Sequence, residues 1–295
     1  MTFKEVAKRC LPPVLIDGGR FLLKRNGRSR ESDHSNSPEW EYIPEGWCIK
    51  DPRIKGWNVE SILQTQKAKW QEFQRSLQQN GPLGVAHEGL APSSNDYAAH
   101  NSIMAYAYAI ALAAHNRDRI SLLDWGGGIG HYYLISKALL PDITIDYYCK
   151  DVPLLCEGGR KLLPEAHFYE NEKDCFARTY DLVLASSSLH YSEDWQRIAQ
   201  RLALATGSYL YITRLPIISR RRSFVVVQRP YQYGYETEYL CWFLNREEFL
   251  IHMRTLEMDL VREFLIQEKP HVHGAPEQGD YRGFLFRPRH GEISK

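Results

Sequence analysis

The stretch that decides the fold is Leu122-Leu123-Asp124-Trp125-Gly126-Gly127-Gly128-Ile129-Gly130-His131. An apolar run typical of a buried strand ends in an acidic residue, and glycines then lead into a helical pattern. A tight turn after such a strand needs positive φ angles, which glycine adopts without a steric penalty. The missing side chains let a ligand lie against the backbone, and the next helix begins with N–H groups that lack partners. The stretch therefore predicts a ligand-binding turn.

Two common nucleotide-binding patterns do not fit this turn. The dinucleotide pattern G-x-G-x-x-G/A would need a small residue where His131 or Tyr133 stands, and a frame that starts at Gly127 puts Ile129 at the second glycine. The phosphate-loop pattern G-x-x-x-x-G-K-S/T does not occur in the sequence. The pattern that fits is D-x-G-x-G-x-G, beginning at Asp124.

Further landmarks follow the turn in order. Asp151 comes 21 residues after Gly130, directly after a strand expected at 143–149. This is close to the spacing at which an acidic residue binds ribose hydroxyls in nucleotide-binding sheets. Phe-Ala-Arg-Thr-Tyr-Asp-Leu-Val-Leu-Ala at 176–185 then runs into Ser-Ser-Ser-Leu-His-Tyr at 186–191.

Together these stretches resemble the class I S-adenosylmethionine (SAM)-dependent methyltransferases over residues 115–290. The glycine turn resembles the first motif of that superfamily, and 176–185 resembles its fourth strand, which commonly begins Tyr/Phe-Asp-Leu-Val. Asp-Trp-Gly-Gly-Gly, Asp-Val-Pro and Ser-Ser-Leu-His-Tyr resemble a bacterial group of methyltransferases associated with polysaccharide or other glycan biosynthesis. The fold more often has Glu where this sequence has Asp151.

Strand and helix patterns alternate from residue 120 onward, which predicts a mostly parallel sheet with helices on both faces. The resemblance makes this α/β domain a Rossmann-like, seven-stranded methyltransferase fold. Strands are expected at 120–125, 143–149, 166–169, 180–185, 208–214, 260–267 and 281–287. Helices are expected at 129–140, 154–163, 195–205 and 249–256.

Residues 1–115 are expected to form an irregular and helical cap, and residues 116–295 the methyltransferase domain. A polar run at 25–37 predicts a loop, and helical patterns cover 58–79 and 94–115, the second with Ser94 or Asn95 as its N-cap. The first 60 residues also contain Trp40, Tyr42, Trp47 and Trp57. These aromatic residues indicate either a lid packed on the main domain or an arm that contacts a ligand.

The amino-acid composition excludes several classes of protein. The chain has 295 residues, 37 Lys and Arg against 36 Asp and Glu, and a net charge of +1, so no charge excess indicates nucleic acid or a membrane as a partner. No stretch approaches the roughly 18 apolar residues of a membrane helix, and Pro12 and Pro13 break the apolar run at the N-terminus. We therefore expect a cytoplasmic protein. The six cysteines form no C-x-x-C pair, and His271 and His273 have no further ligand at metal spacing, so no metal site is expected.

The resemblance assigns cofactor contacts to Asp124, Gly126, Gly128, Gly130, Asp151, Asp174, Ser186 and Ser187. Asp124 would orient the turn and meet the methionine ammonium. Asp174 lies near the position where the family holds adenine, although it could equally be a surface acid.

For the acceptor, we expect contacts from Tyr97, His100, Tyr191, Arg214 and Arg220. His190 follows the fourth strand and could remove a proton from an acceptor hydroxyl, or it could only line the site. His100 could instead be a buried structural histidine. Arg220 could instead belong to a solvated basic loop, together with Arg221 and Arg222.

The sequence thus predicts a SAM-dependent methyltransferase that forms S-adenosylhomocysteine (SAH) and O-methylates a small molecule, sugar or glycan intermediate. The alternatives are a non-catalytic SAM-binding or partner-binding protein with the same fold, an RNA methyltransferase, and a nicotinamide oxidoreductase. Near-zero net charge argues against the RNA enzyme, and the failed dinucleotide frames argue against the oxidoreductase.

Overall fold

The computed structural model describes residues 37–48, 50–81 and 96–289. The described residues from Pro38 onward form one compact unit. Ser94 and Asn95, the expected helix N-cap residues, lie outside the described residues. So does most of the loop expected at 25–37.

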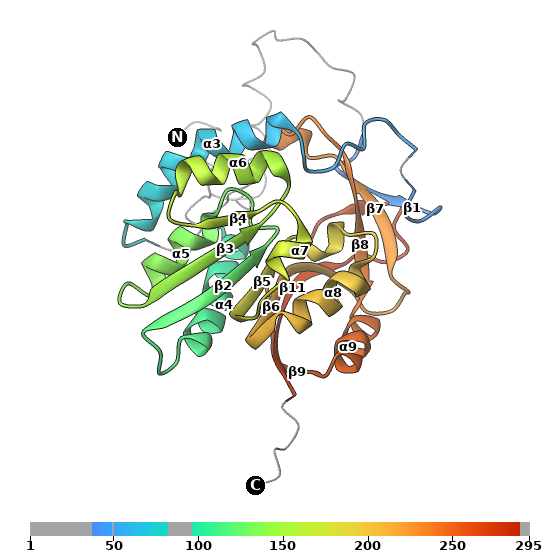
Figure 1. The fold of residues 1–295 in the computed structure, drawn as a ribbon. Helices are drawn as coiled ribbons and strands as arrows, with labels where there is room; N and C mark the ends of the chain where they lie inside the picture. Colours follow the sequence, from blue (N-terminus) through green and yellow to red (C-terminus); the bar gives the residue numbers. More distant parts are fainter. Residues whose placement is uncertain (1–36, 49, 82–95, 290–295) are drawn as a thin grey trace, which may run out of the picture. The chain divides into compact units, whose positions relative to one another are not determined.

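A mostly parallel sheet lies at the centre of the unit (Figure 1). Its order is β4-β3-β2-β5-β6, all parallel, followed by β11 and β9, and β11 runs antiparallel to both β6 and β9. The strand order reverses between β2 and β5, and the edge of an open α/β sheet binds ligands at such a point. The strands are β2 (Arg119–Trp125), β3 (Thr144–Lys150), β4 (His167–Tyr169), β5 (Tyr180–Ser186), β6 (Thr206–Ile218), β9 (Met258–Leu265) and β11 (Asp280–Pro288).

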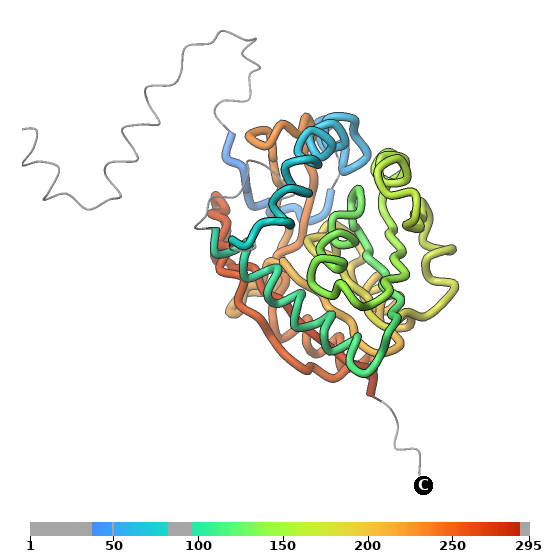
Figure 2. The backbone as a smooth tube through the Cα atoms, turned by 90° about the vertical axis from the view of Figure 1, so that its left-hand side faces the viewer, coloured from blue at the N-terminus to red at the C-terminus, as the bar shows by residue number. Residues whose placement is uncertain are grey.

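Helices cover both faces of this sheet. On one face, α3, α4, α5 and α6 share a core cluster with β2 and β3, and on the other face α8 and α9 pack against β5 and β6. Figure 2 shows the green trace of α4 running across the near side of the molecule. The helices are α3 (Glu60–Leu77), α4 (Tyr97–Ala113), α5 (His131–Leu139), α6 (Pro153–Leu162), α7 (Glu172–Cys175), α8 (Trp195–Leu204) and α9 (Arg246–Thr255). The expected α/β fold is therefore confirmed.

The helices expected ahead of the first strand are present as α3 and α4. The N-cap of α4 is Asp96, whose carboxylate accepts from Ala99 N at 2.9 Å, so the expected cap at Ser94 or Asn95 is wrong by one or two residues. Both helices share the core cluster of the sheet. The domain boundary expected at 115/116 thus falls inside one compact unit, between α4 and β2.

Four strands that the sequence patterns did not indicate extend the sheet beyond β6. They are β1 (Trp40–Ile43), β7 (Phe224–Gln228), β8 (Tyr239–Asn245) and β10 (Val272–His273), in the order β10-β1-β7-β8-β6. Strand β6 runs past its expected end at 214, and its pairing changes from β5 at Thr213 to β8 at Ile217. Arg214 adopts a φ of 48° between these two pairings.

The described ranges contain neither a membrane-spanning helix nor a cluster of metal ligands. None of their helices combines the length and the apolar character needed to cross a lipid bilayer. No group of three or more His, Cys, Asp or Glu side chains within them is arranged to hold a metal ion. Of the cysteines described, Cys149, Cys156, Cys175 and Cys241 are buried free thiols, Cys48 is partly buried, and Cys10 lies outside the described part.

Candidate functional site

The glycine turn has the backbone that the sequence predicts. The φ angles of Gly126, Gly128 and Gly130 are 79°, 62° and 96°, values that favour glycine. Space is also limiting, because a Cβ on Gly126 would lie 2.3 Å from Ser188 Cβ. A Cβ on Gly128 would lie 3.1 Å from Gln66 Oε1 of α3. The turn is thus packed between the segment after β5 and helix α3.

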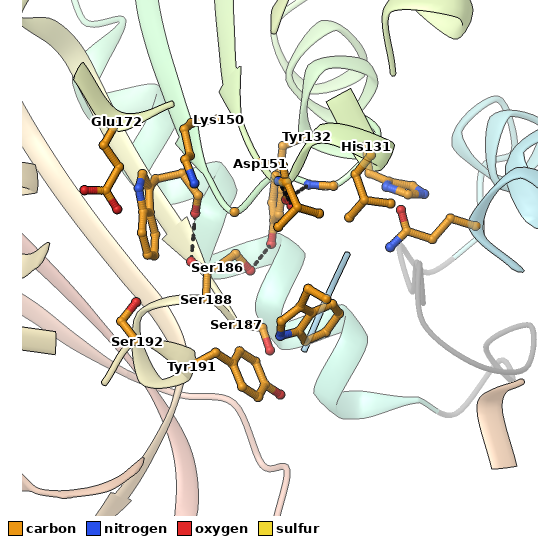
Figure 3. A pocket seen from close by; sticks show the side chains of 18 residues that line it. His131, Tyr132, Lys150, Asp151, Glu172, Ser186, Ser187, Ser188, Tyr191 and Ser192 are labelled. Carbon is orange, nitrogen blue, oxygen red and sulfur yellow. Dashed lines mark hydrogen bonds between the residues drawn. The ribbon is translucent and has the colours of Figure 1, made fainter. Parts of the chain in front are cut away.

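A cavity of about 260 Å³ opens at this turn, at the carboxyl ends of β2, β3 and β5 (Figure 3). This is the point where the strand order reverses, the usual ligand position in an open α/β sheet. Side chains from α3, α5, α7 and the segments after β3 and β5 complete the wall. The lining residues are Trp57, Gln66, Trp125, Gly126, Gly127, Gly128, His131, Tyr132, Lys150, Asp151, Val152, Leu155, Glu172, Ser186, Ser187, Ser188, Tyr191 and Ser192.

Asp151 joins the end of β3 to the glycine turn. Its Oδ2 accepts from Gly128 N at 2.7 Å, and its Oδ1 accepts from Val152 N at 2.6 Å. Burial raises the pKa of this carboxyl group, and the two main-chain N–H donors oppose that shift. Each oxygen keeps a second acceptor position, so Asp151 can bind a ligand hydroxyl while it holds the turn.

Asp124 lies beneath the turn and does not line the cavity. The hydroxyl of Tyr147 donates to its Oδ2 at 2.5 Å, while Oδ1 has no hydrogen-bond partner among the described residues. Complete burial raises the pKa of Asp124 to about 7. Its carboxylate packs directly under Gly127, where an added Cβ would lie 2.4 Å from Oδ2. In this structure Asp124 therefore supports the turn from below.

The serines after β5 form the opposite wall. Ser186 Oγ lies 2.9 Å from the hydroxyl of Tyr132, and Ser188 Oγ donates to Trp125 O at 2.7 Å (Figure 3). Ser187 has a φ of 50°, an uncommon conformation for a residue other than glycine. Its N–H donates to Thr213 O of β6 at 2.9 Å, which keeps the serine segment against the sheet.

The structure separates the expected site residues into two groups. Six of them line the cavity, namely Gly126, Gly128, Asp151, Ser186, Ser187 and Tyr191. Gly130 instead forms the N-cap of α5, where a Cβ would lie 2.6 Å from Leu163. Asp174 is exposed and accepts from the side chain of Asn171 at 2.7 Å, and the acid of α7 that lines the cavity is Glu172.

His190 is completely buried and is not part of the cavity wall. Its ring packs against Tyr191, with the two centroids 4.1 Å apart. Burial, assisted by the positive charge of Arg214, lowers the pKa of His190 to about 3. The imidazole is therefore neutral at physiological pH, and Tyr191 is its link to the cavity.

The other expected acceptor contacts lie away from the cavity. Tyr97 begins α4 with 67% of its surface exposed, and His100 follows on the same helix. Arg214 forms an ion pair with Glu268 at 3.1 Å. Arg220 is exposed, and its N–H donates to Glu277. None of these four residues lines the cavity.

Several wall residues were not among the expected site residues, although Trp57 belongs to the aromatic group interpreted as a lid or a ligand-contacting arm, and three wall residues carry buried polar atoms. Gln66 Oε1, Trp57 Nε1 and Trp125 Nε1 have no hydrogen-bond partner within the described part of the chain. Buried polar groups in native proteins are nearly always paired, so these three atoms are available to hydrogen-bond a bound ligand or water. The sequence pattern could have indicated Gln66, because this polar residue lies on the apolar face of α3. The same face buries Ile62, Leu63 and Trp70.

The chain matches no protein-family model and no curated protein. Among solved structures it is similar to magnesium protoporphyrin IX methyltransferase from Synechocystis PCC 6803 with bound SAM, at 10% identity over 79% of this chain and 100% of that chain, with a TM-score of 0.46. It is also similar to Burkholderia thailandensis 1,6-didemethyltoxoflavin-N1-methyltransferase with bound 1,6-didemethyltoxoflavin and SAH (15% identity, 64% and 80% coverage, TM-score 0.43). A third similar structure is the cyclase SpnF (14% identity, 78% and 97% coverage, TM-score 0.45). The ligands and activities named here belong to those proteins, because identities of 10–15% show a shared fold and no more.

Proposed function

We propose that this chain is a SAM-dependent methyltransferase and that the cavity at the glycine turn binds SAM. The observation that carries the proposal is the convergence of the turn, Asp151 and the Ser186–Ser188 segment on one cavity where the strand order reverses. The buried, unpartnered atoms of Gln66 and Trp125 fit a ligand with both donors and acceptors.

Different wall residues would contact different parts of SAM. We propose that the free acceptor positions of Asp151 take the ribose hydroxyls and that Glu172 accepts from the adenine amino group. Gly126 and Gly128 leave room for the methionine part, and Gln66 Oε1 supplies an acceptor for its ammonium group. Asp124 stabilises the same region from beneath the turn.

Bound SAM supplies a methyl group on a sulfonium, which is already a good leaving group. The chain then has to align the acceptor and exclude water from the reacting atoms. We propose O-methylation of a small molecule, sugar or glycan intermediate, in which the acceptor oxygen takes the methyl group from the sulfonium, SAH leaves, and the hydroxyl proton passes to solvent water. Because His190 contacts Tyr191 rather than the cavity, we assign His190 to positioning Tyr191.

Isothermal titration calorimetry with SAM and SAH tests the proposal directly. We expect both to bind, with a Gly126→Ala variant as the site-specific negative control. Release of SAH in an acceptor screen with labelled SAM would establish turnover. Binding without turnover by any acceptor would favour the non-catalytic alternative, and absence of binding at millimolar ligand would refute the proposed function.

A further inference from the structure

One end of the cavity differs in chemistry from the other. Three charged wall residues, Lys150, Asp151 and Glu172, come from the end of β3 and the start of α7, whereas His131 packs against Trp70 and Phe73 of α3. The wall formed by Trp57 and by the segment after β5, which includes Ser187 and Tyr191, is uncharged. Figure 3 draws Lys150 and Glu172 on one side of the cavity and Ser187 and Tyr191 on the other.

The indole of Trp57 is fixed before any ligand arrives. It stacks on Tyr239 of β8, with centroids 4.5 Å apart and planes inclined by 15°, and the ring of Tyr191 meets it edge-on at 5.0 Å. The neighbouring main chain is held as well, because Gly56 N donates to Glu238 O at 3.3 Å and Thr237 Oγ1 donates to Gly56 O at 2.9 Å. A wall that is already ordered costs less conformational entropy on binding.

Tyr191 is fixed by the same added strands. Its hydroxyl donates to Oε1 of Gln228 in β7 at 2.8 Å, and Gln228 is itself buried. Strands β7 and β8 therefore hold both aromatic rings of this end of the cavity. This gives a physical reason for the extra strands beyond β6, which the methyltransferase resemblance did not predict.

Arg214 and Arg220, the cations suggested by the sequence, do not line this end. Arg214 pairs with Glu268, and Arg220 lies on an exposed loop. Within the described ranges, the lysine or arginine that lines the cavity is Lys150, whose Nζ lies 5.8 Å from the ring centroid of Trp125 at the opposite end. A phosphate or carboxylate placed beside Trp57 and Tyr191 would be desolvated without a partner, which is costly.

Resting on the proposed function, we propose that Trp57, Tyr191 and Ser187 form the acceptor subsite and that it takes an uncharged, hydroxyl-bearing ring compound. Aromatic side chains bind flat apolar ring faces. The buried Nε1–H of Trp57, which lacks a partner among the described residues, supplies a donor for a ring hydroxyl. Phenolic rings and sugar rings share this chemistry, and the test distinguishes them.

Saturation-transfer NMR on the full chain with saturating SAH tests the subsite. The neutral probes are catechol and methyl β-glucopyranoside, and the charged counterparts are phenyl phosphate and glucose 6-phosphate, all at millimolar concentration. We expect transfer to at least one neutral probe and less to both phosphates. A response to catechol alone identifies a phenolic acceptor, and a response to the glucoside alone identifies a sugar.

Two substitutions locate the contact. Trp57→Ala should weaken the neutral probe about threefold to tenfold, because it removes the stacking surface. Trp57→Phe, which keeps an aromatic face, should retain part of the binding and serves if the alanine variant does not fold. The matched control is Trp47→Ala, because Trp47 stacks on Trp242 at 5.9 Å outside the cavity wall.

SAH titration of every variant separates this inference from the proposed function. Failure of the native chain to bind SAH would refute the methyltransferase assignment itself. If SAH binds normally, the subsite is refuted by tighter binding of either phosphate than of the neutral probes, by unchanged binding in the Trp57 variants, or by no transfer to any neutral ring.

Discussion

The main-chain N–H of Gly128 donates to Oδ2 of Asp151 at 2.7 Å, which connects the glycine turn to the end of the neighbouring strand. Asp151 is buried, and its second oxygen accepts from Val152 N, so the carboxylate is fixed by two main-chain donors. The geometry of the turn and the position of the acid are therefore coupled. A change in either residue should alter cofactor binding through the other.

Asp151→Ala should weaken SAM binding about tenfold to a hundredfold, because a hydrogen bond to a charged group contributes about 1.5–3 kcal/mol. Calorimetry on a variant with native circular dichroism measures the effect. Asp142→Ala, which removes an exposed acid on the loop before β3, is the control and should bind SAM normally. Unchanged affinity in Asp151→Ala would mean that another residue holds the ribose.

The two acids of α7 provide a matched pair. Glu172 lines the cavity, with 31% of its side chain exposed, whereas Asp174 is directed to Asn171 outside it. We expect Glu172→Gln to weaken SAM binding about threefold to tenfold, a modest effect because solvent screens a partly exposed charge. Asp174→Asn should leave the dissociation constant unchanged. The reverse order of effects would restore Asp174 as the adenine contact.

Substitutions at two glycines with similar φ angles separate the cost of backbone strain from the cost of steric overlap with neighbouring atoms. Gly46 and Gly126 have φ angles of 75° and 79°, but a Cβ has nothing within 4 Å at Gly46 and would lie 2.3 Å from Ser188 Cβ at Gly126. Gly46→Ala should cost about 1–2 kcal/mol of unfolding free energy and keep SAM binding. Gly126→Ala should cost about 1–3 kcal/mol more and abolish detectable binding. Urea denaturation and calorimetry measure the two effects, and equal losses would argue against the close packing at Ser188.

His190 should make stability depend on pH. Its pKa is about 3 in the folded protein, below the ordinary value of 6.5, so the unfolded chain takes up a proton first as the pH falls. The stabilisation from neutral His190 is complete above pH 6.5 and should decrease by up to about 1.4 kcal/mol per pH unit below it, down to about pH 3. His190→Leu should flatten the dependence of unfolding free energy between pH 7 and 5. His115→Gln, an exposed control, should keep the native slope, and identical slopes for both variants would contradict the buried position of His190.

Catalytic pH dependence follows from the same observation. Because His190 is neutral well below pH 6.5, its titration should not reduce turnover of the folded enzyme between pH 7 and 5. A fall in turnover centred near pH 6.5 that disappears in His190→Leu would show that the imidazole titrates normally and acts as the base.

Local patterns predicted the central sheet well because its strands and helices carry their own signals. The apolar run before Asp124 became β2, Pro153 is the first residue of α6, and Gly130 after β2 is the N-cap of α5. The patterns did not predict β1, β7, β8 and β10. Strand β1 has four residues, and its partner β7 lies more than 180 residues away in the chain, so its hydrogen bonds depend on contacts that local periodicity does not encode.

The sequence by itself determined the glycine turn and the place of Asp151, because backbone conformation and strand-end position are set by residues close together in the chain. Only the tertiary structure decided which side chains meet at the cavity. It placed Gln66 beside the turn and Trp57 in the cavity wall. It also showed that Glu172 and not Asp174 lines the cavity, and that His190 contacts Tyr191 without lining the wall. Burial and direction of a side chain depend on how α3, α7 and the added strands pack on the central sheet, and residue spacing along the chain does not specify that packing.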